Sequence, residues 1–195
     1  MKRLLLLSSL LLASVALPAS AQLQCMFSTA PTTSGTATIS SDNYNIGLIG
    51  IEVPVSCTTS TVAYNVVSVD NSGGKTYDLG LYCVSGTCTP GQRYVHTGAL
   101  SGSAFTPTTG MVIQPWTSSN VTLPAGVYAV GVGTSCSGTA TCAQIAGDSN
   151  SGQILPFFVG NGGTYSSGLP SSVATPSINP VASTATIKMP SLLIY

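Results

Sequence analysis

The stretch Ile46-Gly-Leu-Ile-Gly-Ile-Glu-Val-Pro-Val-Ser-Cys57 decides the fold class of this chain. It is apolar and rich in β-branched residues, and in an extended chain Ile49, Ile51, Val53 and Val55 fall on one face. No stretch after residue 21 keeps the 3.6-residue apolar period of a helix for three turns. The pattern therefore predicts strands rather than helices.

Further segments of the same character follow, separated by turn residues among the 21 glycines and 12 prolines. They are Val62–Val69, Tyr77–Cys83, Met111–Trp116, Asn120–Leu123, Val127–Gly133, Ile154–Val159 and Ala185–Tyr195. Short strands at this spacing are typical of a sandwich or barrel. We predict an all-β fold, with residues 22–195 forming one antiparallel β-sandwich domain, a jelly roll. The long Gly-, Ser- and Pro-rich segment Gly160–Ala182 is expected to be functional or to extend across the sheet.

Residues 1–21 have the build of a secretory signal peptide. Lys2 and Arg3 supply the basic start, about a dozen apolar residues follow, and small residues up to Ala21 form the cleavage site. The apolar stretch is too short to span a bilayer, so we expect no membrane insertion. We expect residues 22–195 to be secreted, either into a periplasm or out of the cell.

All six cysteines lie after the predicted signal peptide, and an even number of cysteines in an exported protein indicates disulfides. Two close pairs each enclose a turn that contains glycine, which favours local pairing and leaves the two remaining cysteines for each other. The predicted disulfides are Cys25–Cys57, Cys83–Cys88 and Cys136–Cys142. A metal cluster is the alternative, but zinc sites favour Cys-x2–4-Cys spacing with histidine partners, and His96 is the only histidine. We therefore predict neither a metal nor a cofactor.

Charged side chains are scarce, with three basic and five acidic residues after residue 21. Nucleic-acid binding needs clustered Lys and Arg, so we expect no nucleic-acid partner. Ser, Thr, Asn and Gly must cover the surface instead, and such a surface has little charge repulsion to keep copies apart. This composition favours a protein that sits in an assembly or on a surface; the alternative is a secreted domain with a plain, uncharged polar coat.

Several motifs between about residues 50 and 195 resemble a known family. They are Tyr77-Asp-Leu-Gly-Leu-Tyr82, Thr89-Pro-Gly-Gln-Arg-Tyr94, His96-Thr-Gly98, Val121-Thr-Leu-Pro-Ala-Gly-Val-Tyr128, Ser167-Gly-Leu-Pro-Ser-Ser and Met189–Tyr195. Their order is similar to that of the jelly-roll domain in phage tail and virion attachment proteins and in related bacterial surface proteins. The resemblance implies a jelly roll that attaches to cell-surface glycans or other receptors. The signal peptide and the disulfides depart from virion proteins, and no binding residue carries over by position.

Catalytic chemistry has little support in the sequence. A Ser-His-Asp site needs a base, and His96, the only histidine, stands in a segment that is typical of a strand edge. A glycosidase needs two carboxylates across one cleft, and no spacing places Asp78 and Asp148 in that relation. We predict that the protein is not an enzyme. The loops at Asp70 and Asp148 offer calcium-type oxygen ligands, but each lacks the later acidic residue and is more typical of an Asx turn.

Aromatic rings are the usual platforms for sugars, and three lie near loops or glycine-rich turns: Tyr94, Trp116 and Tyr165. We take these as candidate ligand-binding residues, with a core position as the alternative for Trp116. The leading hypothesis is an exported, non-catalytic module that binds a carbohydrate or a cell-surface receptor. The second hypothesis is a structural subunit of a surface layer or appendage that self-associates.

Overall fold

The computed structural model describes residues 23–28, 35–38, 47–71, 74–136, 142–148, 157–158, 165, 168–173, 178–179, 189–190 and 192–195. Within these ranges the chain forms antiparallel strands and one short helix, α1 (Gly102–Phe105). Two seven-stranded sheets are packed together, and a two-stranded sheet is formed by β10 (Val121–Leu123) and β4 (Cys57–Thr59). The predicted all-β sandwich is confirmed, and the jelly roll stays a prediction.

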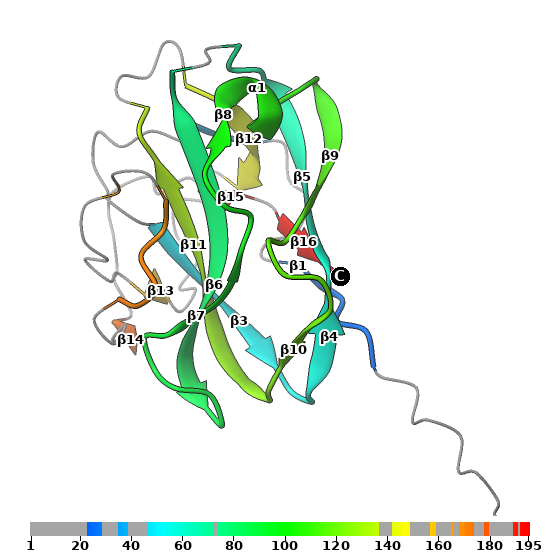
Figure 1. The fold of residues 1–195 in the computed structure, drawn as a ribbon, viewed down its shortest axis with the longest axis vertical. Coiled ribbons are helices and arrows are strands. Elements are labelled where there is room, and N and C mark those ends of the chain that lie inside the picture. The colour runs from blue at the N-terminus through cyan, green and yellow to red at the C-terminus, as the bar shows by residue number, and fades with distance from the viewer. Residues whose placement is uncertain are drawn as a thin grey trace, which may run out of the picture.

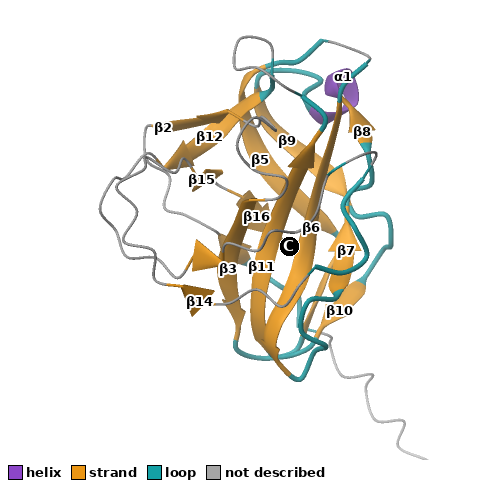
Figure 2. Ribbon diagram, turned by 90° about the vertical axis from the view of Figure 1, so that its left-hand side faces the viewer, coloured by secondary structure: helices purple, strands orange, loops and turns teal. Residues whose placement is uncertain are grey.

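The first large sheet, called here the β6 sheet, is centred on its two longest strands. Its order is β14 (Ile178–Asn179), β13 (Phe157–Phe158), β3 (Gly47–Val53), β11 (Gly126–Thr134), β6 (Thr76–Gly86) and β7 (Arg93–His96), with β8 (Leu100–Ser101) also paired to β6. The decisive segment at residues 46–57 thus supplies β3, which pairs with β11 along its whole length. Figure 2 shows β11 and β6 in front of the other sheet.

The second large sheet, called here the β5 sheet, brings the two ends of the described chain together. Its order is β1 (Phe27–Ser28), β16 (Leu192–Ile194), β5 (Thr61–Ser68), β12 (Gln144–Asp148) and β15 (Met189–Pro190), with β2 (Gly35–Thr38) beside β12 and β9 (Gly110–Pro115) beside β5. Figure 1 shows β5 and β9 on the right-hand side of the molecule and β11 and β3 to their left.

The main hydrophobic core lies between the two sheets. In β6, Tyr77, Leu79 and Leu81 alternate along the strand and point into this core, where β5 contributes Tyr64 from the opposite sheet. The ring of Phe105 in α1 stacks on both Tyr64 and Tyr77, with centroids 4.8 Å away in each case. The short helix therefore closes the core at one end rather than forming a layer of its own.

The three predicted disulfides are confirmed, with the predicted partners. They join Cys25 to Cys57, Cys83 to Cys88 and Cys136 to Cys142. All six residues are buried and belong to the main core cluster. The described residues include no free cysteine. The disulfides therefore cross-link residues of the hydrophobic core itself.

The boundaries of several elements differ from the predictions. The segment at 46–57 divides into β3 and the start of β4, and β7, β12 and α1 were not predicted as elements. In α1, the Ser101 side chain accepts a hydrogen bond from the Ala104 N–H, which is the usual N-cap arrangement. The predicted signal peptide, residues 1–21, lies outside the described residues. No helix in the described part of the chain is long and apolar enough to cross a membrane.

Candidate functional site

The three candidate aromatic residues do not form one platform. Trp116 is buried in the main core, and its indole N–H donates to the Thr59 hydroxyl over 2.8 Å. Tyr94 is half-buried and packs edge-on against Tyr128, with ring centroids 5.6 Å apart. Tyr165 is 93% covered and belongs to a second cluster on the other side of the β6 sheet. A sugar platform needs an accessible ring face. Of the three rings, only that of Tyr94 is partly accessible, because Trp116 and Tyr165 are buried.

The segment at residues 168–173, called here the strap, crosses the outer face of the β6 sheet. The Arg93 N–H donates to the Ser171 carbonyl and the Val173 N–H donates to the Gly91 carbonyl, both over 2.9 Å. The Arg93 guanidinium also donates to the Leu169 carbonyl. This part of Gly160–Ala182 therefore extends across the sheet, which is one of the two predicted alternatives.

Small residues on the sheet make room for the strap and for Tyr165. A Cβ on Gly133 would lie 2.3 Å from the Tyr165 ring, and a Cβ on Gly80 would lie 2.9 Å from Leu169. The buried members of this second cluster are Tyr82, Val84, Ala129, Tyr165, Leu169 and Val173. Burial raises the pKa of the Tyr82 phenol, which stays protonated and donates to the Pro170 carbonyl over 2.8 Å.

A buried carboxylate joins the strap to the sheet. Asp78 lies on β6 with no exposed surface, and its Oδ2 accepts from the Leu169 N–H of the strap over 2.9 Å. The same oxygen lies 2.9 Å from Nδ1 of His96 on β7, and Oδ1 accepts from the Thr97 hydroxyl over 3.1 Å. A carboxylate with three donors is well satisfied, so Asp78 anchors the strap from beneath.

The Asp78–His96 pair has the geometry of the carboxylate and base in a hydrolase triad. Among the described residues, however, no hydroxyl or thiol is hydrogen-bonded to the free imidazole nitrogen of His96. The other partner of Asp78 Oδ2 is the strap backbone at Leu169. His96 and Leu169 thus share one carboxylate oxygen, and we call this arrangement the clamp because it links β6, β7 and the strap.

Of the two loops considered for calcium, the structure describes the aspartate side chain of only one. The Asp70 carboxylate points inward, where its Oδ2 accepts from the Tyr77 hydroxyl over 2.5 Å. Burial, and then this hydrogen bond, raise the pKa of the Tyr77 phenol, which keeps the donated proton in place. The side chain of Asp148 lies outside the described residues. No group of three His, Cys, Asp or Glu residues that could hold a metal ion occurs in the described ranges.

The outer face of the β5 sheet carries exposed, large apolar side chains that the sequence analysis did not single out. We call this the bare face; its members are Val67, Met111, Ile113 and Leu193. Met111 is 65% exposed and Ile113 is 56% exposed. Leu193 on β16 and Ile113 on β9 both lie opposite Ala63 of β5, so the three form one row across the sheet.

The strands under the bare face carry no charge. β1, β5, β9 and β16 contain no Asp, Glu, Lys or Arg. Soluble monomers rarely expose contiguous apolar surface, and natural sheet edges are usually protected by charged side chains. The bare face is therefore both apolar and uncharged.

The chain matches no known family model, and searches of curated proteins and of solved structures find no significant match. The resemblance to jelly-roll attachment domains consequently rests on the sequence motifs alone.

Proposed function

We propose that this chain is an exported, non-catalytic structural subunit that associates with further copies of itself through the bare face. The observation that carries the proposal is the exposure of Met111, Ile113 and Leu193 on strands without charge. An uncharged, apolar surface gains free energy when a like surface covers it, and it meets no repulsion from that surface. A charged receptor would find no complementary group on these strands.

Three disulfides in the core support the exported location that residues 1–21 predict. Disulfides persist in oxidising compartments and suit a subunit that must stay folded outside the cytoplasm. The three candidate rings contribute less support to carbohydrate attachment, because Trp116 and Tyr165 are buried and only Tyr94 is half-buried.

The test is light scattering after size-exclusion chromatography, on the oxidised protein expressed from its full sequence. We expect the mass to rise with protein concentration, and we expect the double variant Met111→Thr/Ile113→Thr to reduce that rise. The matched control is Ser118→Thr/Ser119→Thr, which changes two exposed positions outside the bare face and adds no charge.

A strict monomer at every concentration would refute self-association. A monomer that binds a crude cell-envelope polysaccharide extract, and loses that binding on Tyr94→Ala, would instead favour the carbohydrate-binding module. Association that the Met111→Thr/Ile113→Thr variant leaves unchanged would place the contact on a surface other than the bare face.

A further inference from the structure

One edge of β9 has no partner among the described strands, because β9 pairs only with β5. The Trp116 N–H donates to the Ser60 carbonyl over 3.0 Å. This bond determines which residues of β9 form backbone hydrogen bonds with β5. In such a ladder, alternate residues direct both backbone groups to the same neighbour. Val112 and Gln114 therefore direct theirs toward β5, and Met111 and Ile113 direct theirs away from it.

The open edge is short and has definite ends. At one end, Gly110 has φ +100°, which breaks the regular extended backbone. At the other end, Pro115 lacks an N–H. Only Met111 and Ile113 can therefore offer both a donor and an acceptor on this edge, and both side chains are exposed on the bare face.

We propose that β9 pairs antiparallel with the β9 strand of a second copy, with Met111 opposite Ile113 of the partner subunit. This inference rests on the proposed self-association and adds to it a contact at the edge of β9, beside the bare face. A twofold axis then passes at Val112, and each of the two Met111–Ile113 pairs exchanges two backbone hydrogen bonds. All four backbone groups of Met111 and Ile113 become satisfied in this register.

Other registers pair Met111 and Ile113 less completely. A slip of two residues in one direction brings Met111 opposite Pro115 of the partner subunit, which has no N–H to donate, so the Met111 carbonyl is left without a donor. A slip of two residues in the other direction takes the pairing past Gly110, where the backbone is no longer extended. A slip of one residue turns the side chains of one β9 strand to the opposite face of the joined sheet.

The proposed pair joins two β5 sheets into one continuous sheet. The row formed by Leu193, Ala63 and Ile113 then continues to Met111 of the partner subunit, so apolar side chains cover one another across the junction. Because both copies use the same β9 edge for the contact, no β9 edge remains available for a third copy. Pairing through β9 therefore gives a dimer and not a filament.

Amide hydrogen exchange on the unmodified, oxidised protein gives a direct test. In the dimer, the N–H groups of Met111 and Ile113 are hydrogen-bonded, whereas within one copy they have no partner among the described strands. We expect both amides to exchange at least about tenfold more slowly at concentrations where light scattering reports the dimer. Equal exchange of these two amides in monomer and dimer would overturn the pairing.

Substitutions separate edge pairing from stacking of the bare faces. Ile113→Pro removes one of the two N–H donors of the β9 edge, whereas Ile113→Thr keeps that donor. Leu193→Ser removes apolar surface on β16, away from the edge. We expect Ile113→Pro to weaken dimerisation by at least about tenfold and the other two variants to weaken it less. Circular dichroism checks that each variant keeps its strands.

The possible failures are distinguishable. A dimer that survives Ile113→Pro but is lost on Leu193→Ser overturns the β9 pairing and leaves the proposed self-association through the bare face intact. A wild-type chain that stays monomeric at every concentration overturns both the pairing and the proposed function.

Discussion

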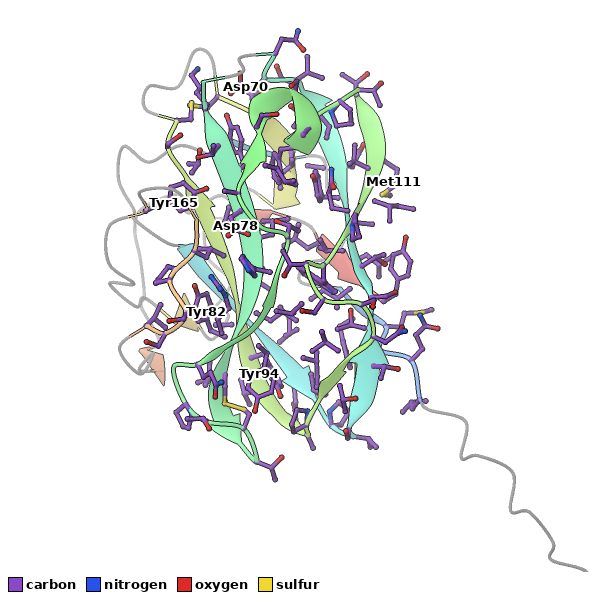
Figure 3. The ribbon with its side chains drawn as sticks, viewed as in Figure 1. Asp70, Asp78, Tyr82, Tyr94, Met111 and Tyr165 are labelled. Atoms are coloured by element: carbon purple, nitrogen blue, oxygen red, sulfur yellow. A yellow bond between two sulfur atoms is a disulfide. The ribbon has the colours of Figure 1, made fainter. Side chains whose placement is uncertain are left out.

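The two sheets of the sandwich differ in how their outer faces are covered. The β6 sheet carries the strap and Tyr165 on its outer face, whereas the β5 sheet leaves Met111 and its neighbours exposed. Figure 3 shows Tyr165 and Met111 on opposite sides of the molecule, with Asp78 between them. One outer face is thus closed by the chain itself, and the other keeps large apolar side chains exposed.

The difference begins with side-chain size. The covered face presents Gly80, Ala129 and Gly133, and these small residues leave space into which Tyr165 and Leu169 fit. The bare face presents Met111, Ile113 and Leu193 in outward positions, and no described segment lies over them. The space at Gly80 and Gly133 therefore lets the chain cover the outer face of its own β6 sheet.

The largest expected effect comes from the disulfide beside the bare face. Replacing Cys25 and Cys57 by serine releases a loop with a sequence separation of 32 and should lower the free energy of unfolding by about 3–4 kcal/mol. On the covered sheet, replacing Cys83 and Cys88 by serine releases a loop with a sequence separation of only 5. This should lower the free energy of unfolding by about 2 kcal/mol. Urea unfolding of the two double variants measures the difference; equal losses would contradict the loop-length argument.

On the covered face, Asp78→Ala should lower the free energy of unfolding by about 3 kcal/mol, because Leu169, His96 and Thr97 all lose an acceptor. The matched variant His96→Ala removes one donor at the edge of the same cluster and should cost about 1 kcal/mol. Amide exchange of residues 168–173 should speed up in Asp78→Ala. An unchanged exchange rate there would show that the carboxylate does not hold the strap.

Gly133→Ala tests the space under Tyr165. The new Cβ would lie 2.3 Å from the Tyr165 ring, so the ring must shift, at a cost of about 1–3 kcal/mol. Gly74→Ala is the control, because a Cβ there meets nothing within 4 Å. Thermal unfolding should show a lower melting temperature for Gly133→Ala only. A similar change for both variants would mean that backbone entropy, and not the contact, sets the effect.

The smallest expected effect on stability is on the bare face. Met111→Thr should change the free energy of unfolding by no more than about 0.5 kcal/mol, because the side chain is already exposed. Val112→Thr, the neighbouring inward position, should cost about 1–3 kcal/mol by burying a hydroxyl. Chemical unfolding at a concentration where the protein is monomeric makes this comparison. A large loss for Met111→Thr would show that the bare face contributes to the monomer's own stability.

The sequence predicted the strands and disulfides that depend on local signals. Alternation identified the segment of β6 at residues 77–83, and the turns between Cys83 and Cys88 identified their pairing. β12 was missed because Ile145 is its only large apolar residue and the strand is held by neighbours far along the chain. A local sequence pattern contains no information about such distant strand partners.

The site residues were less predictable for the same reason. Trp116 follows a proline near a strand end, but its burial depends on Thr59, which lies 57 residues earlier. In β9 the run Met111-Val112-Ile113 is apolar on both faces, so no alternation reveals which side chains point outward. The clamp at Asp78 likewise forms only when β6, β7 and the strap meet.

The disulfide between Cys25 and Cys57 also determines how the molecule would carry a pulling force. Tension applied between Leu23 and Tyr195 would reach Cys25 before it reaches β1, which begins at Phe27. The covalent bond to Cys57 would then transfer the load directly into β4. The chain between these two cysteines is thereby shielded from extension, and the disulfide acts as a mechanical stop for the sandwich.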